Sequence, residues 1–100
     1  MNIIWSPTSR KKIDDIVDYI SLDNVDAALA LVEEFESRVN DLKRNPRLGR
    51  KSPLFQDERI RDLIVRKKYL IVYEIKDDQI EILTIRHTSQ DLDESDSETD

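Results

Sequence analysis

The stretch that decides the fold is KYLIVYEIKDDQIEILTIRHTSQ, which runs from Lys68 to Gln90. Its two halves are rich in β-branched and aromatic residues, and the polar run Lys76-Asp77-Asp78 separates them. This pattern predicts two strands joined by a tight turn. Both faces of the predicted strands carry apolar residues over most of their length. The hairpin should therefore lie inside a sheet, not at its edge.

A turn at Asp77 and Asp78 fixes the expected register of this hairpin. On one face the pairs are Ile75–Ile80, Tyr73–Ile82, Ile71–Thr84 and Tyr69–Arg86, and on the other they are Val72–Leu83 and Leu70–Ile85. Each apolar pair contributes roughly 0.2–1 kcal/mol. Glu74 opposite Glu81 is the one unfavourable pair, and it lies near the solvated turn.

Two helices are predicted upstream of the hairpin. Ser6-Pro7 ends a short first strand, Asn2–Trp5, and begins the first helix, because a serine caps free N–H groups and proline suits the first helical position. The pattern of Ile13, Ile16, Val17 and Ile20 gives this helix one buried face as far as Leu22.

Asp23-Asn24 caps a second helix, predicted over Val25–Arg44. Its buried stripe consists of Ala28, Val32, Phe35, Val39 and Leu42, widened by Leu29 and Leu31. So short a connection requires an antiparallel helix hairpin. A loop then leads to a strand over Glu58–Arg66.

The element order is therefore strand–helix–helix–strand–strand–strand (β-α-α-β-β-β). The expected fold class is α+β, a two-layer sandwich with the helix hairpin packed on a mostly antiparallel four-stranded sheet. Residues 1–90 form one domain, and the acidic residues 91–100 are expected to be disordered.

The charge of the chain is segregated. Residues 91–100 hold six of the 22 acidic residues and no basic one, so residues 1–90 are neutral overall. Within them, Lys43–Lys68 holds ten basic and three acidic residues. This imbalance predicts a surface that binds an anion or an acidic partner, and the acidic tail is a candidate to fold back over it.

Composition excludes several classes of site. The chain has no cysteine, which excludes thiolate metal sites and fits a reducing cytosol. No apolar run approaches the roughly 20 residues that span a bilayer, so we expect a cytoplasmic protein without membrane contact. Its single glycine, Gly49, argues against a glycine-rich phosphate loop. No metal or cofactor is expected.

This order of elements, with these residues, resembles the RelE/ParE superfamily of toxins from type II toxin–antitoxin modules, over Ile4 to about Gln90. The residues that carry the resemblance are Trp5-Ser6-Pro7, Ile16–Ile20, Asn24–Ala28, Asn45–Arg50, Arg61–Val65, Tyr69–Tyr73 and Ile80–His87. The resemblance implies two activities on one fold. RelE-like members cleave mRNA on the ribosome without a metal, and ParE-like members poison DNA gyrase.

The ending His87-Thr88-Ser89-Gln90 and the segment Asn45–Arg50 look more ParE-like. No aromatic residue follows Tyr73, whereas RelE-like toxins typically have a tyrosine near the chain end. We therefore expect a ParE-like toxin, with a RelE-like endoribonuclease or an inactive homologue as the alternatives. The resemblance also implies a ParD- or RelB-like antitoxin that lays a helix beside the helix hairpin. Contact with operator DNA would occur only through that antitoxin.

The candidate functional residues are Arg61, Arg86 and His87, which we expect at one open rim of the sheet. In RNA cleavage the arginines would stabilise the phosphorane, and His87 would act as acid or base. Arg47, Arg50, Lys51 and Lys68 are the candidates for binding a partner or nucleic acid. Purely structural roles also stay open: the arginines could form strand-to-strand ion pairs, His87 could bond to backbone, and Tyr69, Tyr73 and Trp5 could be core residues.

Overall fold

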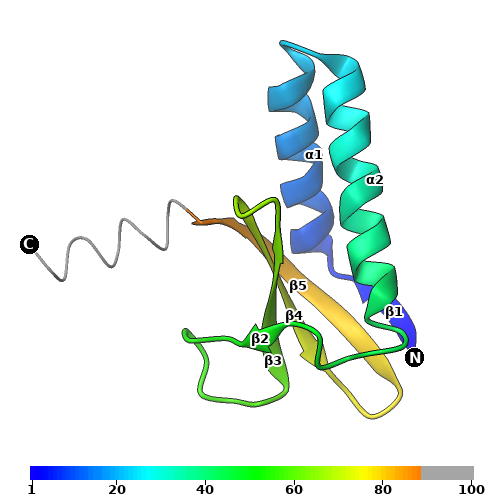
Figure 1. The fold of residues 1–100 in the computed structure, drawn as a ribbon, viewed down its shortest axis with the longest axis vertical. Coiled ribbons are helices and arrows are strands. Elements are labelled where there is room, and N and C mark those ends of the chain that lie inside the picture. The colour runs from blue at the N-terminus through cyan, green and yellow to red at the C-terminus, as the bar shows by residue number, and fades with distance from the viewer. Residues whose placement is uncertain (89–100) are drawn as a thin grey trace, which may run out of the picture.

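The computed structural model describes residues 1–88, so the predicted domain boundary at residue 90 and the acidic segment 91–100 lie outside the described residues. The elements are β1 (Asn2–Trp5), α1 (Pro7–Ser21), α2 (Val25–Asp41), β2 (Arg50–Lys51), β3 (Ile60–Val65), β4 (Tyr69–Ile75) and β5 (Gln79–His87). The two helices form an antiparallel hairpin that packs on one side of the sheet and projects beyond it (Figure 1). The predicted α+β class and two-layer arrangement are confirmed.

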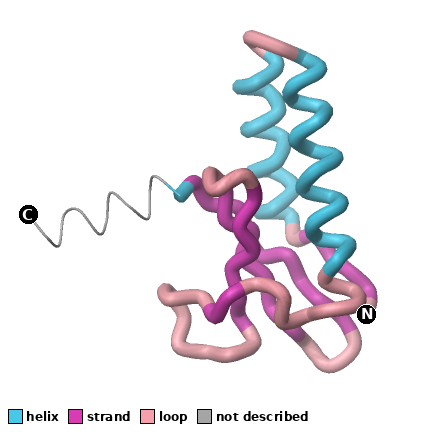
Figure 2. Tube along the Cα trace, in the orientation of Figure 1, coloured by secondary structure: helices cyan, strands magenta, loops and turns pink. Residues whose placement is uncertain are grey.

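The sheet has five strands in the order β1-β5-β4-β3-β2, where four were predicted. The strand that sequence reasoning missed is β2, a pair of basic residues, Arg50–Lys51, that bonds to β3 opposite Asp62 and Arg61. So short a strand carries no apolar pattern. As expected for an interior hairpin, β4 and β5 lie between other strands. The first strand, β1, pairs parallel to β5, which the helix hairpin makes possible by crossing the sheet (Figure 2).

Both helices begin at the predicted caps. The Ser6 hydroxyl accepts a hydrogen bond from the Ser9 N–H at 3.0 Å, and the Asn24 side chain accepts one from the Ala27 N–H at 3.0 Å. The second helix ends at Asp41 instead of Arg44. Residues 42–44 each donate to the carbonyl three residues back, so the chain tightens into 3₁₀-type turns there.

The core lies between the helices and the sheet. It contains twelve buried residues: three from α2, Leu42 directly after α2, and eight from β3, β4 and β5. Phe35 of α2 meets the Tyr69 ring edge-on, with ring centroids 5.3 Å apart, and Tyr73 is fully buried. Burial of each large apolar side chain contributes roughly 1.5–3 kcal/mol, so this layer holds the helix hairpin on the sheet. The core roles predicted for both tyrosines are confirmed.

A β-bulge corrects the predicted register of the central hairpin. Next to the turn the pairs Ile75–Ile80, Glu74–Glu81 and Tyr73–Ile82 are as predicted. Beyond them Leu83 is passed over, so that the observed pairs are Val72–Thr84, Ile71–Ile85, Leu70–Arg86 and Tyr69–His87. The bulge coincides with the start of α1: Ser6 donates its N–H to the Ile82 carbonyl at 3.0 Å and its hydroxyl to the Leu83 carbonyl at 2.8 Å.

The helix hairpin is less buried than its periodicity predicts. In α1 the face formed by Ile13, Ile16, Val17 and Ile20 is only half-buried, and Leu29 of α2 is exposed. The reason is geometric, because the far half of the hairpin extends past the sheet and has no second layer beneath it (Figure 1). Within residues 1–88 no helix has the length and apolar character needed to cross a membrane.

Candidate functional site

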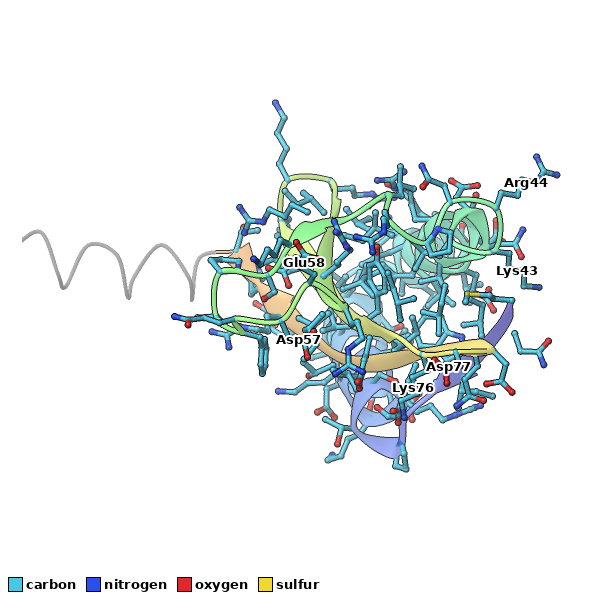
Figure 3. The ribbon with its side chains drawn as sticks, turned by 90° about the horizontal axis from the view of Figure 1, so that it is seen from below. Lys43, Arg44, Asp57, Glu58, Lys76 and Asp77 are labelled. Carbon is cyan, nitrogen blue, oxygen red and sulfur yellow. The ribbon has the colours of Figure 1, made fainter. Side chains whose placement is uncertain are left out.

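The connection between α2 and β3 begins with residues 43–51, which we call the basic loop. It carries five cations and no acidic residue: Lys43, Arg44, Arg47, Arg50 and Lys51. All five side chains are exposed. Seen from below, the basic loop, the β2–β3 loop and the β4–β5 turn share the end of the molecule that lies opposite the tip of the helix hairpin (Figure 3).

The basic loop is tied to the core by the buried Tyr73. Its hydroxyl donates to the Pro46 carbonyl at 2.6 Å and accepts from the Gly49 N–H at 2.9 Å. Burial raises the pKa of the Tyr73 hydroxyl, while the bond from Gly49 lowers it by less. The neutral hydroxyl can therefore act as donor and acceptor at once, which fixes two points of the loop.

Gly49 is needed because the loop approaches the sheet so closely. A Cβ at this position would lie 2.7 Å from the Asp62 carbonyl oxygen and 2.9 Å from two atoms of Tyr73. From the sequence, Gly49 served to exclude a phosphate loop and stood in the segment Asn45–Arg50 that carries the family resemblance, and its close approach to the sheet was not predicted. The available signal was that glycine, which permits such an approach, occurs once in the chain.

Arg61 has a structural role in the same arrangement. Its guanidinium donates through Nη1 to the Gly49 carbonyl at 3.0 Å and through Nε to the Glu58 carbonyl at 3.1 Å. These two bonds join the basic loop to the end of the β2–β3 loop. Arg50 is held beside it by the buried carboxylate of Asp62, at 3.6 Å. The loop is therefore ordered before any partner arrives.

Two acidic side chains at this end of the molecule, Asp57 and Glu81, are paired with cations. Asp57 pairs with Arg59 at 3.1 Å, and hydrogen bonding to the Arg59 side chain lowers the pKa of the Asp57 carboxyl. Glu81 pairs with Lys76 at 2.8 Å. Among the described residues, by contrast, Arg47 and Lys51 form no ion pair. Arg47 and Lys51 of the basic loop therefore present charge that no ion pair among the described residues neutralises.

The structure does not bring Arg61, Arg86 and His87 to one rim, and that expectation is wrong. Arg61 lies opposite Tyr73, on the face of the sheet that packs against the helices. Arg86 lies opposite Leu70, on the other face. The bulge at Leu83 accounts for the change of face, because a shift of one residue exchanges the two faces of a strand. The two arginines are also separated along the sheet, since Arg61 pairs with Tyr73 and Arg86 with Leu70, roughly 10 Å further along β4.

The same shift brings His87 to the helix side. Its ring meets the Tyr69 ring edge-on, with centroids 5.5 Å apart. Lys68, the fourth predicted binding residue, sits in the turn between β3 and β4, with its ammonium group 5.9 Å from the centroid of the Tyr69 ring. It is therefore at the far end of β3 from the basic loop. Of the binding candidates, the structure places Arg47, Arg50 and Lys51 together.

No group of three or more His, Cys, Asp or Glu side chains within residues 1–88 could hold a metal ion.

Comparison with known proteins identifies the family. The family described as "ParE toxin of type II toxin-antitoxin system, parDE" matches residues 3–92. A relative from Sinorhizobium fredii (strain NBRC 101917 / NGR234), named "Putative toxin Y4kP", is 33% identical over 89 residues, which cover 88% of each chain.

Two solved structures have the same fold. One, titled "Chromosomal ParDE TA system from P. aeruginosa", has a TM-score of 0.71 and 24% identity and covers 87% of this chain and 95% of its own. The other, titled "YoeB/ParE toxin from Agrobacterium tumefaciens", has a TM-score of 0.61 and 17% identity, covering 87% and 98%. Together with the family match over residues 3–92, these findings show that the chain belongs to the ParE family of type II toxin–antitoxin toxins.

Proposed function

We propose that this toxin acts in the cytoplasm by binding DNA gyrase directly, and that a cognate antitoxin neutralises it. The observation that carries the proposal is the basic loop, five exposed cations on a segment that Tyr73 and Arg61 fix to the core. A surface that is already ordered loses little conformational freedom on binding, and this favours recognition of a macromolecular partner.

The alternative, RelE-like cleavage of mRNA, depends on an acid or base and cations that converge on one phosphate. Arg61 is engaged with two backbone carbonyls, and Arg86 faces away from it across the sheet. This dispersal supports a binding function over the cleavage that these three residues were expected to perform. Arg86 and His87 stay candidates for contact with the target.

The gyrase proposal is tested with purified protein in a DNA supercoiling assay and, in parallel, in a translation extract. The expected result is loss of supercoiling with trapped DNA breaks, reversed by the antitoxin, while mRNA stays intact. Cleaved mRNA with normal supercoiling would contradict the proposal and support the RelE-like alternative. If neither activity were affected, the chain would be an inactive homologue.

The role of the basic loop is tested with Arg47→Gln/Lys51→Gln. Arg50 is left in place because its guanidinium pairs with the buried carboxylate of Asp62. The matched control is Lys11→Gln/Lys12→Gln, which removes two exposed cations from α1. We expect the loop variant to need at least a fivefold higher concentration than wild type to inhibit gyrase. Its inhibition should also depend less on the salt concentration. Equal inhibition by the two variants would show that the loop is not the interface.

A groove beside the helix hairpin is the surface we propose for the antitoxin. It consists of two hollows, of about 140 and 430 Å³, that share Trp5 and Glu36 and are lined by residues of β1, α1 and α2. Val32, Val39 and Ile13 give it apolar walls, which suits the apolar face of an amphipathic helix.

Trp5 is the only tryptophan of the chain, so its fluorescence reports directly on this groove. Titration with the antitoxin should change the emission in a saturable way, and Val32→Glu should weaken binding at least tenfold. Exposed Leu54→Glu, in the β2–β3 loop and not among the residues that line the groove, is the control. An unchanged Trp5 emission on formation of a stable complex would place the antitoxin elsewhere.

A further inference from the structure

The tip of the helix hairpin exposes an unusual amount of apolar surface. Residues 18–29, which we call the hairpin tip, include Tyr19, Leu22, Val25 and Leu29, with exposures of 77%, 86%, 58% and 54%. No other large apolar residue in the described part of the chain exceeds 47%. A hollow of about 420 Å³ lies among Tyr19, Ile20, Leu22 and Asp23. Clustered apolar exposure of this kind marks sites of protein interaction.

The hairpin tip is also strongly acidic. Residues 13–37 contain eight acidic residues and no basic one. Asp18, Asp23 and Asp26 lie within the tip, and none of them belongs to an ion pair formed by the described residues. The apolar side chains are therefore surrounded by negative charge that the fold itself does not neutralise.

Packing against the rest of the protein does not account for this surface. The tip projects beyond the sheet and lies at the opposite end of the molecule from the basic loop (Figure 1). The groove proposed for the antitoxin is lined by Trp5 and by residues closer to the sheet. The tip is therefore separate from both surfaces described above and has the opposite charge to the basic loop.

We infer that the hairpin tip is a docking surface for a protein segment that carries apolar side chains flanked by lysine or arginine. Apolar residues of the partner would cover Tyr19, Leu22, Val25 and Leu29, and its cations would meet Asp18, Asp23 and Asp26. Charge complementarity selects this partner, because a neutral or acidic segment would leave the three carboxylates unpaired or repelled. The toxin thereby has a second binding end, independent of the function assigned to the basic loop.

The test uses the full chain and a fluorescent 14-residue peptide of leucine and lysine in an amphipathic helical pattern. One control peptide replaces each lysine with glutamate, and another replaces each leucine with serine. Fluorescence anisotropy at two salt concentrations measures the affinities. We expect only the leucine–lysine peptide to bind well, because the surface combines apolar contact with negative charge.

Variants of the tip locate the binding. Leu22→Ser/Leu29→Ser should lower the affinity for the leucine–lysine peptide at least tenfold. Asp18→Asn/Asp23→Asn should lower this affinity about threefold and make it depend less on the salt concentration. Leu54→Ser/Phe55→Ser, which changes exposed apolar residues at the other end of the molecule, should leave affinity within twofold. Because the substituted leucines are exposed, thermal denaturation should show all variants folded.

The inference is overturned if the serine-for-leucine peptide binds equally well, since attraction to carboxylates anywhere on the chain would then explain the result. It is also overturned if the three variants bind alike. Sedimentation of the wild-type chain gives a third outcome: self-association abolished by Leu22→Ser/Leu29→Ser would mean that the tip binds a second copy instead. In hydrogen exchange, the bound peptide should slow the exchange of residues 18–29 of the wild-type chain. Slower exchange elsewhere instead would contradict the proposal, and this measurement does not depend on whether a variant folds.

Discussion

The helix hairpin and the basic loop are held in place in different ways. The hairpin is specified locally, by the caps Ser6 and Asn24 and by apolar residues at helical spacing. The basic loop contains short turns, with bonds such as that from the Leu48 N–H to the Asn45 carbonyl. Its position against the sheet depends on Tyr73 and Arg61, which lie 24 and 12 residues after Gly49 in the chain. One region is determined by its own residues and the other by the sheet beneath it.

The helix hairpin and the basic loop should differ in how much stability a single substitution removes. In the hairpin many weak contacts share the stabilisation, and its tip is free of the core. In the basic loop a few buried polar atoms carry the whole arrangement, so a change of one atom has a large effect. Substitutions in the loop should therefore cost more stability than substitutions in the hairpin.

The largest effect is expected from Gly49→Ala. The new Cβ would overlap the Asp62 carbonyl and Tyr73, so the loop must move and give up its bond to the Tyr73 hydroxyl. We expect a loss of about 3 kcal/mol in the free energy of unfolding, at the upper end for overpacking. Urea denaturation measures it. An unchanged midpoint would mean that the loop is free to shift, and that the contrast with the hairpin is unfounded.

Tyr73→Phe removes a single oxygen and leaves the Pro46 carbonyl and the Gly49 N–H without their partner. The expected cost is about 2 kcal/mol, because buried groups lose their hydrogen bonds. Hydrogen exchange should become faster in residues 45–51 and stay unchanged in α1 and α2. Uniformly faster exchange would indicate that the tyrosine stabilises the whole fold instead of the loop.

The contribution of the Tyr73 hydroxyl to the free energy of unfolding depends on pH. Its pKa in the folded state is raised above the unfolded value of about 10, chiefly by burial. Its stabilisation is therefore complete below about pH 10 and is lost as the pH rises through the folded-state pKa. The stability difference between wild type and Tyr73→Phe should be constant from pH 7 to 9 and narrow above pH 10. A difference that widened there would contradict the assigned cause.

Arg61→Met removes the two bonds to the Gly49 and Glu58 carbonyls while it keeps much of the side-chain volume. We expect a loss of about 1.5 kcal/mol and weaker partner binding through disorder of the basic loop. The matched control is Arg38→Met in α2, whose guanidinium makes an exposed bond of 3.4 Å to the Ile64 carbonyl and an exposed ion pair of 3.9 Å with Asp41. If both variants lost equal stability, the bonds from Arg61 to the two carbonyls would not be what holds the basic loop in place.

Asn24→Ala probes the hairpin side of the comparison and should have the smallest effect. It removes the cap on the Ala27 N–H, an exposed bond of 3.0 Å, at a cost of about 1 kcal/mol. Circular dichroism and thermal denaturation measure the change, and exposed Ser37→Ala is the control. If Asn24→Ala lost more unfolding free energy than Tyr73→Phe, substitutions in the hairpin would cost more stability than substitutions in the basic loop, contrary to the expectation.

Sequence reasoning succeeded where the signal is local. Both caps, the starts of both helices, the order of elements and the interior place of the central hairpin follow from patterns within a few residues of each other. It failed at Leu83, where the bulge depends on bonds from Ser6, 77 residues away in the chain. That shift turned Arg86 to the other face of the sheet, and the pairing of Arg61 with Tyr73 places it several residues further along β4, so the predicted functional cluster does not form. It failed likewise at β2, whose two residues form a strand only because β3 lies beside them.

The sequence by itself determined both helices, four of the five strands, the fold class and the excess of cations in Lys43–Lys68, because these depend on residue type and on short-range periodicity. The family resemblance, too, could be recognised from residues in order along the chain. Only the tertiary structure decided which faces the cations occupy, that Tyr73 and Arg61 hold the basic loop, and that the hairpin tip stays uncovered. These features depend on where distant carbonyls, rings and strands meet in space, and no local pattern encodes that.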